Sequence, residues 1–137
     1  MDGIKVFVYG TLIQGQHNHR VAEPFLLEAK EGAVKGNLFS VGGFPALALD
    51  GENQIEVKGQ WFTVAEEGLK NMDRLEGYQE GSPYNHYERV RVTDINGVDE
   101  GFVYVYSMKK CIGRGLPVIE SGSWVEYHQA RRKAYQY

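Results

Sequence analysis

The chain has 137 residues, of which 42% are hydrophobic and 24% are charged. This is the size and composition of a globular protein with its own core, so neither complete disorder nor a collagen-like chain fits, and we expect residues 1–137 to form one domain. A formal net charge of −3 and a pI near 5.8 argue against a general nucleic-acid binder and favour a small-molecule partner.

The single cysteine, Cys111, and the N-terminal residues determine the compartment that we expect. One cysteine cannot form an intramolecular disulfide or supply a cysteine-based zinc site, so a cytoplasmic setting is the default expectation. Residues 1–10 lead directly into a strand-like run, and no segment approaches the ~20 apolar residues of a membrane helix. We therefore expect neither export nor membrane insertion.

The first third of the chain predicts a strand, a polar loop and a helix. Residues 4–9 are β-branched and aromatic and end at Gly10, which indicates a buried, central strand. Residues 19–29 place apolar side chains at roughly helical spacing, and Pro24 makes the expected helix short or kinked.

Strand-like runs alternate with turn signals through the rest of the chain. Asn96 and Gly97 stand between two alternating runs and predict a hairpin. Because strands outnumber helices and several are apolar on both faces, we predict an α+β fold, a small mixed β-barrel with flanking short helices. The further strands are expected at residues 33–39, 46–49, 55–64, 86–95 and 100–106.

Two more helices are expected. Residues 65–75 carry apolar side chains three positions apart and predict a short amphipathic helix that Gly77 ends. Ser123 is a candidate N-cap for a last helix that runs to about Lys133.

The turn after the first strand is the first candidate site. Gly10 can adopt a positive φ, and successive backbone N–H groups of Tyr9, Gly10, Thr11 and Leu12 could then converge on one anion, such as a substrate carboxylate. A strand followed by Gly and Thr is also common in ordinary turns, and spacing alone favours that simpler interpretation.

Glu76 is the second candidate, because it falls where the predicted helix ends. The C-terminal carbonyls of a helix disfavour a nearby carboxylate, and Asp73, one turn earlier, adds like-charge repulsion. Both effects raise the pKa of Glu76, as a general base working near neutral pH requires. Solvated glutamates at helix ends are nevertheless the commoner case.

Other polar groups have simpler interpretations. Residues 84–89 fit a hairpin strand with a polar outer face. No acidic cluster accompanies the four histidines and no two are spaced as a helical zinc pair, so we reject a dedicated metal site. Cys111 has no His or Asp nearby in the sequence, and we expect a buried or partly buried, inert thiol.

Taken together, these segments resemble the γ-glutamylcyclotransferase-like family, also called AIG2-like, over nearly the whole chain. The opening string is similar to that of its γ-glutamylamine cyclotransferase branch, and a run that ends in Glu76 is similar to the family segment that carries the catalytic glutamate. The matching stretches are residues 6–12, 15–19, 72–76, 87–89, 102–106 and 119–124. Residues 77–83 are insertion-like relative to the family pattern.

The resemblance implies a small mixed β-barrel that cyclises a γ-glutamyl group to 5-oxoproline and releases an amine or amino acid. It implies that Glu76 is the catalytic acid/base and that no cofactor is needed. The residues implied for the substrate loop are Tyr9, Gly10, Thr11 and Leu12. As candidate pocket-lining residues we add Tyr87, Tyr104 and Tyr106.

Two other classes of function remain open at the level of sequence. One is a non-catalytic module that holds a small carboxylate in the same cavity. The other is a single-strand nucleic-acid binder that stacks bases on Phe102, Tyr104 and Tyr106, against which the negative net charge counts. The leaving group also stays open between γ-glutamyl-ε-lysine, other γ-glutamylamines, γ-glutamyl amino acids and acylated metabolites, as does the oligomeric state.

Overall fold

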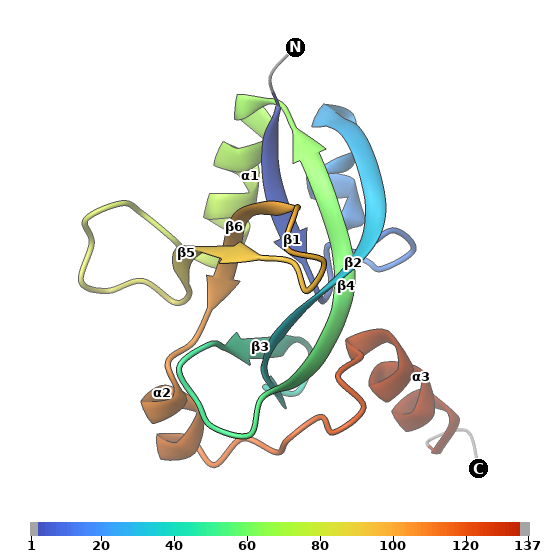
Figure 1. Ribbon diagram of the computed structural model, residues 1–137, viewed down its shortest axis with the longest axis vertical. Coiled ribbons are helices and arrows are strands. Elements are labelled where there is room, and N and C mark those ends of the chain that lie inside the picture. The colour runs from blue at the N-terminus through green and yellow to red at the C-terminus, as the bar shows by residue number, and fades with distance from the viewer. Residues whose placement is uncertain (1–2, 135–137) are drawn as a thin grey trace.

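A computed structural model describes residues 3–134 of the chain as a mixed six-stranded sheet with short helices (Figure 1). The strand order is β3-β2-β4-β1-β6-β5, in which β1 and β6 are parallel and all other neighbours are antiparallel. The α+β fold predicted from the sequence is therefore confirmed. The strands are β1 Ile4–Val8, β2 Leu26–Ser40, β3 Pro45–Ala48, β4 Ile55–Val64, β5 Glu88–Thr93 and β6 Glu100–Val105.

Three α-helices and two 3-10 turns accompany the sheet. In Figure 1, α1 lies alongside β1, and α2 and α3 lie at the opposite end of the molecule. No helix within residues 3–134 is long and apolar enough to cross a membrane. The helical elements are η1 His19–Val21, η2 Glu23–Phe25, α1 Glu66–Glu76, α2 Met108–Gly113 and α3 Trp124–Ala134.

The helix ends follow the signals in the sequence. Gly77 is left-handed, with φ 65°, and the amides of Gly77 and Tyr78 donate to carbonyls of the last turn of α1. The Ser123 hydroxyl accepts a 3.2 Å hydrogen bond from the amide of Glu126 and caps α3. Both predicted helix boundaries are confirmed.

Strand β1 is central, as predicted, because it pairs with β4 on one side and β6 on the other. Its side chains alternate between two hydrophobic clusters, with Val6 and Val8 in one cluster and Phe7 in the other. Both faces of this strand are therefore covered, which explains why its sequence is apolar throughout.

The sheet is not a closed barrel, so that part of the predicted fold class was wrong. Strands β3 and β5 are its two edges and do not pair with each other. The long β2–β4 pair curls the sheet until the amide of Tyr106, just after β6, donates a 2.9 Å hydrogen bond to the Leu47 carbonyl in β3. A curled open sheet buries strands on both faces almost as a barrel does, which is why the sequence pattern did not distinguish the two.

The helix predicted at residues 19–29 is also wrong. The chain forms two single 3-10 turns there, and from Leu26 onward it is already the first part of β2. Pro24 has no amide N–H to donate and lies in the second turn, while pairing with β4 holds residues 26–32 extended. Helix α2 was not predicted from the sequence, although Ser107 caps it by accepting a hydrogen bond from the Lys110 amide.

Gly59 provides a direct test of the close contact between β4 and β1. A Cβ atom at this position would overlap the Val8 carbonyl oxygen and lie 2.8 Å from the Phe7 ring. We expect Gly59→Ala to lower the free energy of unfolding by about 1–3 kcal/mol in chemical denaturation, as overpacking does. Gly113→Ala is the matched control, since a Cβ there meets no atom within 4 Å, and a similar loss in both variants would contradict this account of the contact.

Candidate active site

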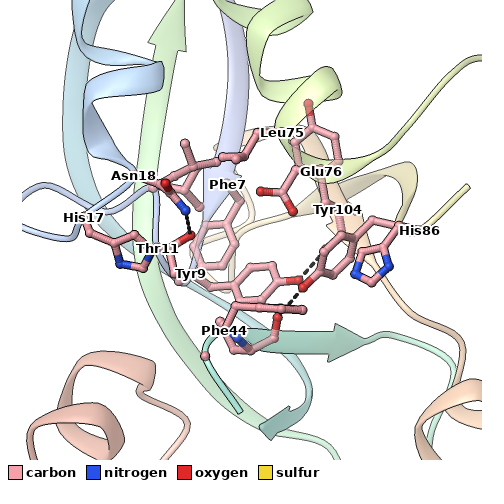
Figure 2. A pocket seen from close by; sticks show the side chains of 16 residues that line it. Phe7, Tyr9, Thr11, His17, Asn18, Phe44, Leu75, Glu76, His86 and Tyr104 are labelled. Carbon is pink, nitrogen blue, oxygen red and sulfur yellow. Dashed lines mark hydrogen bonds between the residues drawn. The ribbon is translucent and has the colours of Figure 1, made fainter. Parts of the chain in front are cut away.

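A cavity of about 460 Å³ opens where β1 ends, beside the C-terminus of α1 (Figure 2). Its walls come from the end of β1 and the loop after it, the turn before β3, the end of α1 and residues that flank or belong to β5 and β6. The lining residues are Phe7, Val8, Tyr9, Gly10, Thr11, Leu12, His17, Asn18, Gly43, Phe44, Pro45, Leu75, Glu76, His86, Tyr87 and Tyr104.

The loop after β1 lines this cavity and carries backbone amides without partners. Gly10, Thr11 and Leu12 are buried, and their amides have no hydrogen-bond acceptor within residues 3–134. Asn18 holds the loop in place, because its backbone amide donates to the Thr11 carbonyl and its side-chain amide donates to Thr11 Oγ1, both at 3.0 Å. Buried amides without partners are costly, so a ligand with acceptor oxygens would be stabilised here.

Gly10 is needed in this loop for a reason other than the predicted one. It is not among the glycines with positive φ, so the expectation that its backbone angle forms the turn was wrong. A Cβ atom at Gly10 would instead lie 2.6 Å from Cγ and 2.7 Å from Cδ of Pro45. Close packing against Pro45, the first residue of β3, requires glycine at this position.

Glu76 is the last residue of α1, and its carboxyl group points into the middle of the cavity, next to the Tyr9 ring (Figure 2). Its side chain has no hydrogen-bond or ion-pair partner among the described residues. Burial raises the pKa of Glu76 to about 7. The direction agrees with the sequence-based expectation, but the cause is burial rather than the helix carbonyls and Asp73.

Asp73 does not act on Glu76 as an isolated charge because it is paired. One of its carboxylate oxygens lies 2.7 Å from Arg89 Nη1, and the other accepts a 2.6 Å hydrogen bond from the Tyr104 hydroxyl. The Arg89 guanidinium lies between two aromatic rings, 4.8 Å from the centroid of Tyr78 and 4.5 Å from that of Phe102. We call Asp73, Arg89 and Tyr104 the Asp73 network.

Three tyrosines form the floor of the cavity or lie behind it. The Tyr9 hydroxyl donates to the Tyr104 carbonyl at 2.6 Å and accepts from the Leu47 amide, and the Tyr87 hydroxyl donates to the Pro45 carbonyl at 2.6 Å. Burial and the nearby Glu76 charge hold the pKa of Tyr9 and of Tyr87 well above the usual range, so both remain neutral.

The structure separates Tyr106 from the other aromatic residues predicted to line the cavity. Its ring packs on Tyr87 with centroids 4.8 Å apart, and the cavity wall does not include it. Tyr104 and Tyr106 are both almost fully buried, so their rings do not form the open stacking platform of the nucleic-acid hypothesis. Sequence reasoning missed Phe44, which follows two glycines and gave no signal beyond that of a turn.

Cys111 and the histidines form no further centre. The Cys111 side chain is fully buried, which confirms the expected burial, and this burial raises the pKa of its thiol to about 11. Within residues 3–134, no three metal-ligating side chains lie close enough together to hold an ion.

The protein is thus a small α+β protein with a curled sheet, and its cavity contains one carboxyl group, that of Glu76, as the active site of an enzyme would. Residues 6–126 match the model of the family described as Gamma-glutamyl cyclotransferase, AIG2-like, and the chain belongs to this family.

Curated relatives and solved structures agree with this assignment. The Gamma-L-glutamyl-butirosin B gamma-glutamyl cyclotransferase of Niallia circulans is 39% identical over 106 residues, which are 74% of this chain and 66% of that relative. A putative gamma-glutamylcyclotransferase of Methanocaldococcus jannaschii is 30% identical over 128 residues, covering 89% of this chain and 96% of that one. The crystal structure of an AIG2-like protein from Mus musculus superposes with a TM-score of 0.68 at 25% identity, covering 88% of each chain.

The raised pKa of Glu76 leads to a prediction about stability. The folded protein keeps the proton of the Glu76 carboxyl up to about pH 7, whereas the unfolded chain releases it near pH 4.5. The free energy of unfolding therefore falls as the pH rises between these values. We expect Glu76→Gln to be more stable than the wild type at neutral pH, by up to about 3 kcal/mol, and equal to it at pH 4. Chemical denaturation at both pH values measures this, and equal stability at pH 7.5 would contradict the burial of the charge.

The Asp73 network leads to a prediction about the pKa of Glu76. Arg89→Met leaves the Asp73 charge unpaired one turn from Glu76, so we expect the pKa of Glu76 to rise above its wild-type value. NMR titration of the Glu76 side-chain carboxyl carbon gives this pKa directly. Arg91→Met is the matched control, because Arg91 lies on the same strand but pairs with the exposed Glu100; an unchanged pKa in Arg89→Met would show that Arg89 does not compensate Asp73.

Proposed function

We propose that this protein cyclises the γ-glutamyl group of a small molecule to 5-oxoproline and releases an amine or amino acid, with Glu76 as general acid/base. The observation that carries this proposal is the half-buried Glu76 carboxyl, which lines the cavity, has no partner among the described residues and has its pKa raised by burial to about 7. A group with this pKa gains and releases a proton easily at neutral pH, as acid/base catalysis requires.

The substrate supplies its own nucleophile. A free α-ammonium has a reference pKa of about 7.7–8.0 and is largely protonated at neutral pH. Glu76 in its carboxylate form removes one proton, and the amine nitrogen then attacks the γ-carbonyl carbon to form the five-membered ring. The bond from that carbon to the leaving nitrogen breaks, and Glu76 returns the proton to the leaving amine. The ring nitrogen gives up its second proton to solvent, and the released amine takes up a proton to leave as an ammonium ion, so no cofactor or co-reactant is consumed.

Intramolecular attack makes this chemistry possible in a small cavity. Effective molarities of well-oriented intramolecular reactions reach ~10⁵–10⁸ M, so the protein mainly has to fold the substrate and transfer a proton. The amides of Gly10, Thr11 and Leu12 are suited to hold the α-carboxylate, because no lysine or arginine lines the cavity. The Thr11 hydroxyl accepts a hydrogen bond from Asn18 and keeps its own proton to donate.

The family supports the class of reaction. The relatives from Niallia circulans and Methanocaldococcus jannaschii both bear the name of γ-glutamyl cyclotransferases, the second as a putative one. The alternative function is a binding module that holds a small carboxylate in the same cavity without converting it. Such a module would bind a γ-glutamyl compound and leave it intact.

Cyclisation is tested by incubating the protein with a panel of γ-glutamyl amines and γ-glutamyl amino acids and following 5-oxoproline by mass spectrometry. We expect at least one compound to be cyclised and Glu76→Gln to lose about 10²–10⁴-fold in turnover, the usual contribution of a positioned acid/base. The variant's melting curve at pH 7.5 controls for folding.

Two outcomes would count against this function. If the wild type binds γ-glutamyl compounds but returns them unchanged, the binding module is the better description. If Glu76→Gln forms 5-oxoproline at the wild-type rate, Glu76 has no part in the proton transfer.

A further inference from the structure

The wall of the cavity away from the Gly10–Leu12 loop contains His86. Figure 2 shows Thr11, His17 and Asn18 at one side, the Glu76 carboxyl in the middle and His86 at the other side. The His86 ring meets Phe44 edge-on, with centroids 5.7 Å apart. On the proposed function, a substrate held by its α-carboxylate at the loop and by its γ-carbonyl near Glu76 places its leaving group against this wall.

Hydrogen bonds determine the state of the His86 ring. Arg114 Nη1 donates to the Tyr106 hydroxyl at 3.2 Å, and that hydroxyl lies 2.8 Å from His86 Nε2. An arginine can only donate, and the Tyr106 side chain is 2% exposed, so its own proton needs an acceptor and goes to Nε2. His86 is then a neutral ring that carries its proton on Nδ1.

Two cations, Lys110 of α2 and Arg114 directly after it, lie behind this ring. Lys110 Nζ donates a 2.6 Å hydrogen bond to the His86 carbonyl and lies 4.0 Å from the centroid of the Tyr106 ring, while Arg114 is joined to His86 through the Tyr106 hydroxyl. Neither Lys110 nor Arg114 pairs with a carboxylate within residues 3–134. Their positive charges therefore lie behind the His86 wall and are held by uncharged groups, and Glu88 acts on Lys110 only through space, without an ion pair.

We propose that Lys110 and Arg114 select the leaving group by its charge: they favour leaving groups that carry a carboxylate over neutral ones, and neutral ones over cationic amines. Two unpaired cations close to one wall give that wall a positive potential, which attracts an anion and repels a cation. The two residues are specificity-determining rather than catalytic, because they act on the far end of the substrate and not on the reacting atoms.

Three substrates of matched size test this selection: γ-glutamylglycine, γ-glutamylglycinamide and γ-glutamyl-ethylenediamine, whose leaving groups are anionic, neutral and cationic. We expect kcat/KM for 5-oxoproline formation to fall in that order, by about tenfold at each step at low salt and by less at high salt. The double variant Lys110→Gln, Arg114→Gln should act on all three compounds with similar kcat/KM.

Two further variants separate charge from packing. Arg114→Lys keeps the positive charge and should keep the order, and Lys109→Gln is the control on the same helix, since Lys109 is exposed and makes no contact with His86 or Tyr106. Equal kcat/KM for the three substrates in the wild type, or an unchanged order in the double variant, would overturn the selection by charge while leaving cyclisation intact. Absence of 5-oxoproline with all γ-glutamyl compounds would overturn the proposed function itself.

Discussion

The burial of one carboxyl group, that of Glu76, is the constraint on which the rest of the site depends. A carboxylate removed from water without a partner is unfavourable, and the protein meets this by holding the proton to about pH 7. Left-handed Gly77 ends α1 directly after Glu76, so the carboxyl group extends into the cavity from the final helical turn. The same feature that destabilises the folded state thus gives the site a proton that can be exchanged at neutral pH.

Because of its surroundings, the proton of the Glu76 carboxyl is the one at this site that is easily exchanged. The pKa of Tyr9 and of Tyr87 is raised by burial, so both hydroxyls remain neutral and donate to fixed carbonyls. Asp73 is compensated by Arg89 and Tyr104, which hold both of its carboxylate oxygens. The hydroxyls of Tyr9, Tyr87 and Tyr104 are thus satisfied by protein acceptors, while Glu76 and the amides of the loop after β1 have no partner among the described residues.

Much of the fold was predictable because local signals and tertiary pairing agree. The apolar run of β1, the Asn96-Gly97 hairpin and the glycine after Glu76 each fix a boundary within a few residues. The prediction failed at residues 19–29, where a helical spacing of apolar side chains was overridden by pairing between β2 and β4. The sequence also predicted a barrel where the structure has a curled open sheet, because both arrangements bury the two faces of a strand.

The candidate site was predictable in its residues but less so in its physical causes. Resemblance to a family pointed to Glu76 and to the loop after β1, yet it did not reveal that Gly10 is required by contact with Pro45 or that Arg89 compensates Asp73. Those contacts join residues that are 35 and 16 positions apart, and the local sequence around either partner does not indicate them. Phe44 reaches the cavity wall, and Lys110 and Arg114 come to lie behind His86, for the same reason, through tertiary packing.

The pH dependence of kcat/KM for 5-oxoproline formation is the most direct measurement of the central claim, that a buried Glu76 carboxylate removes the proton of the attacking amine. The ascending limb of this profile reports the pKa of the essential base in the free enzyme. We expect its midpoint near pH 7, the value to which burial raises the pKa of Glu76. A midpoint near 4.5, the ordinary value for a solvated glutamate, would contradict the claim.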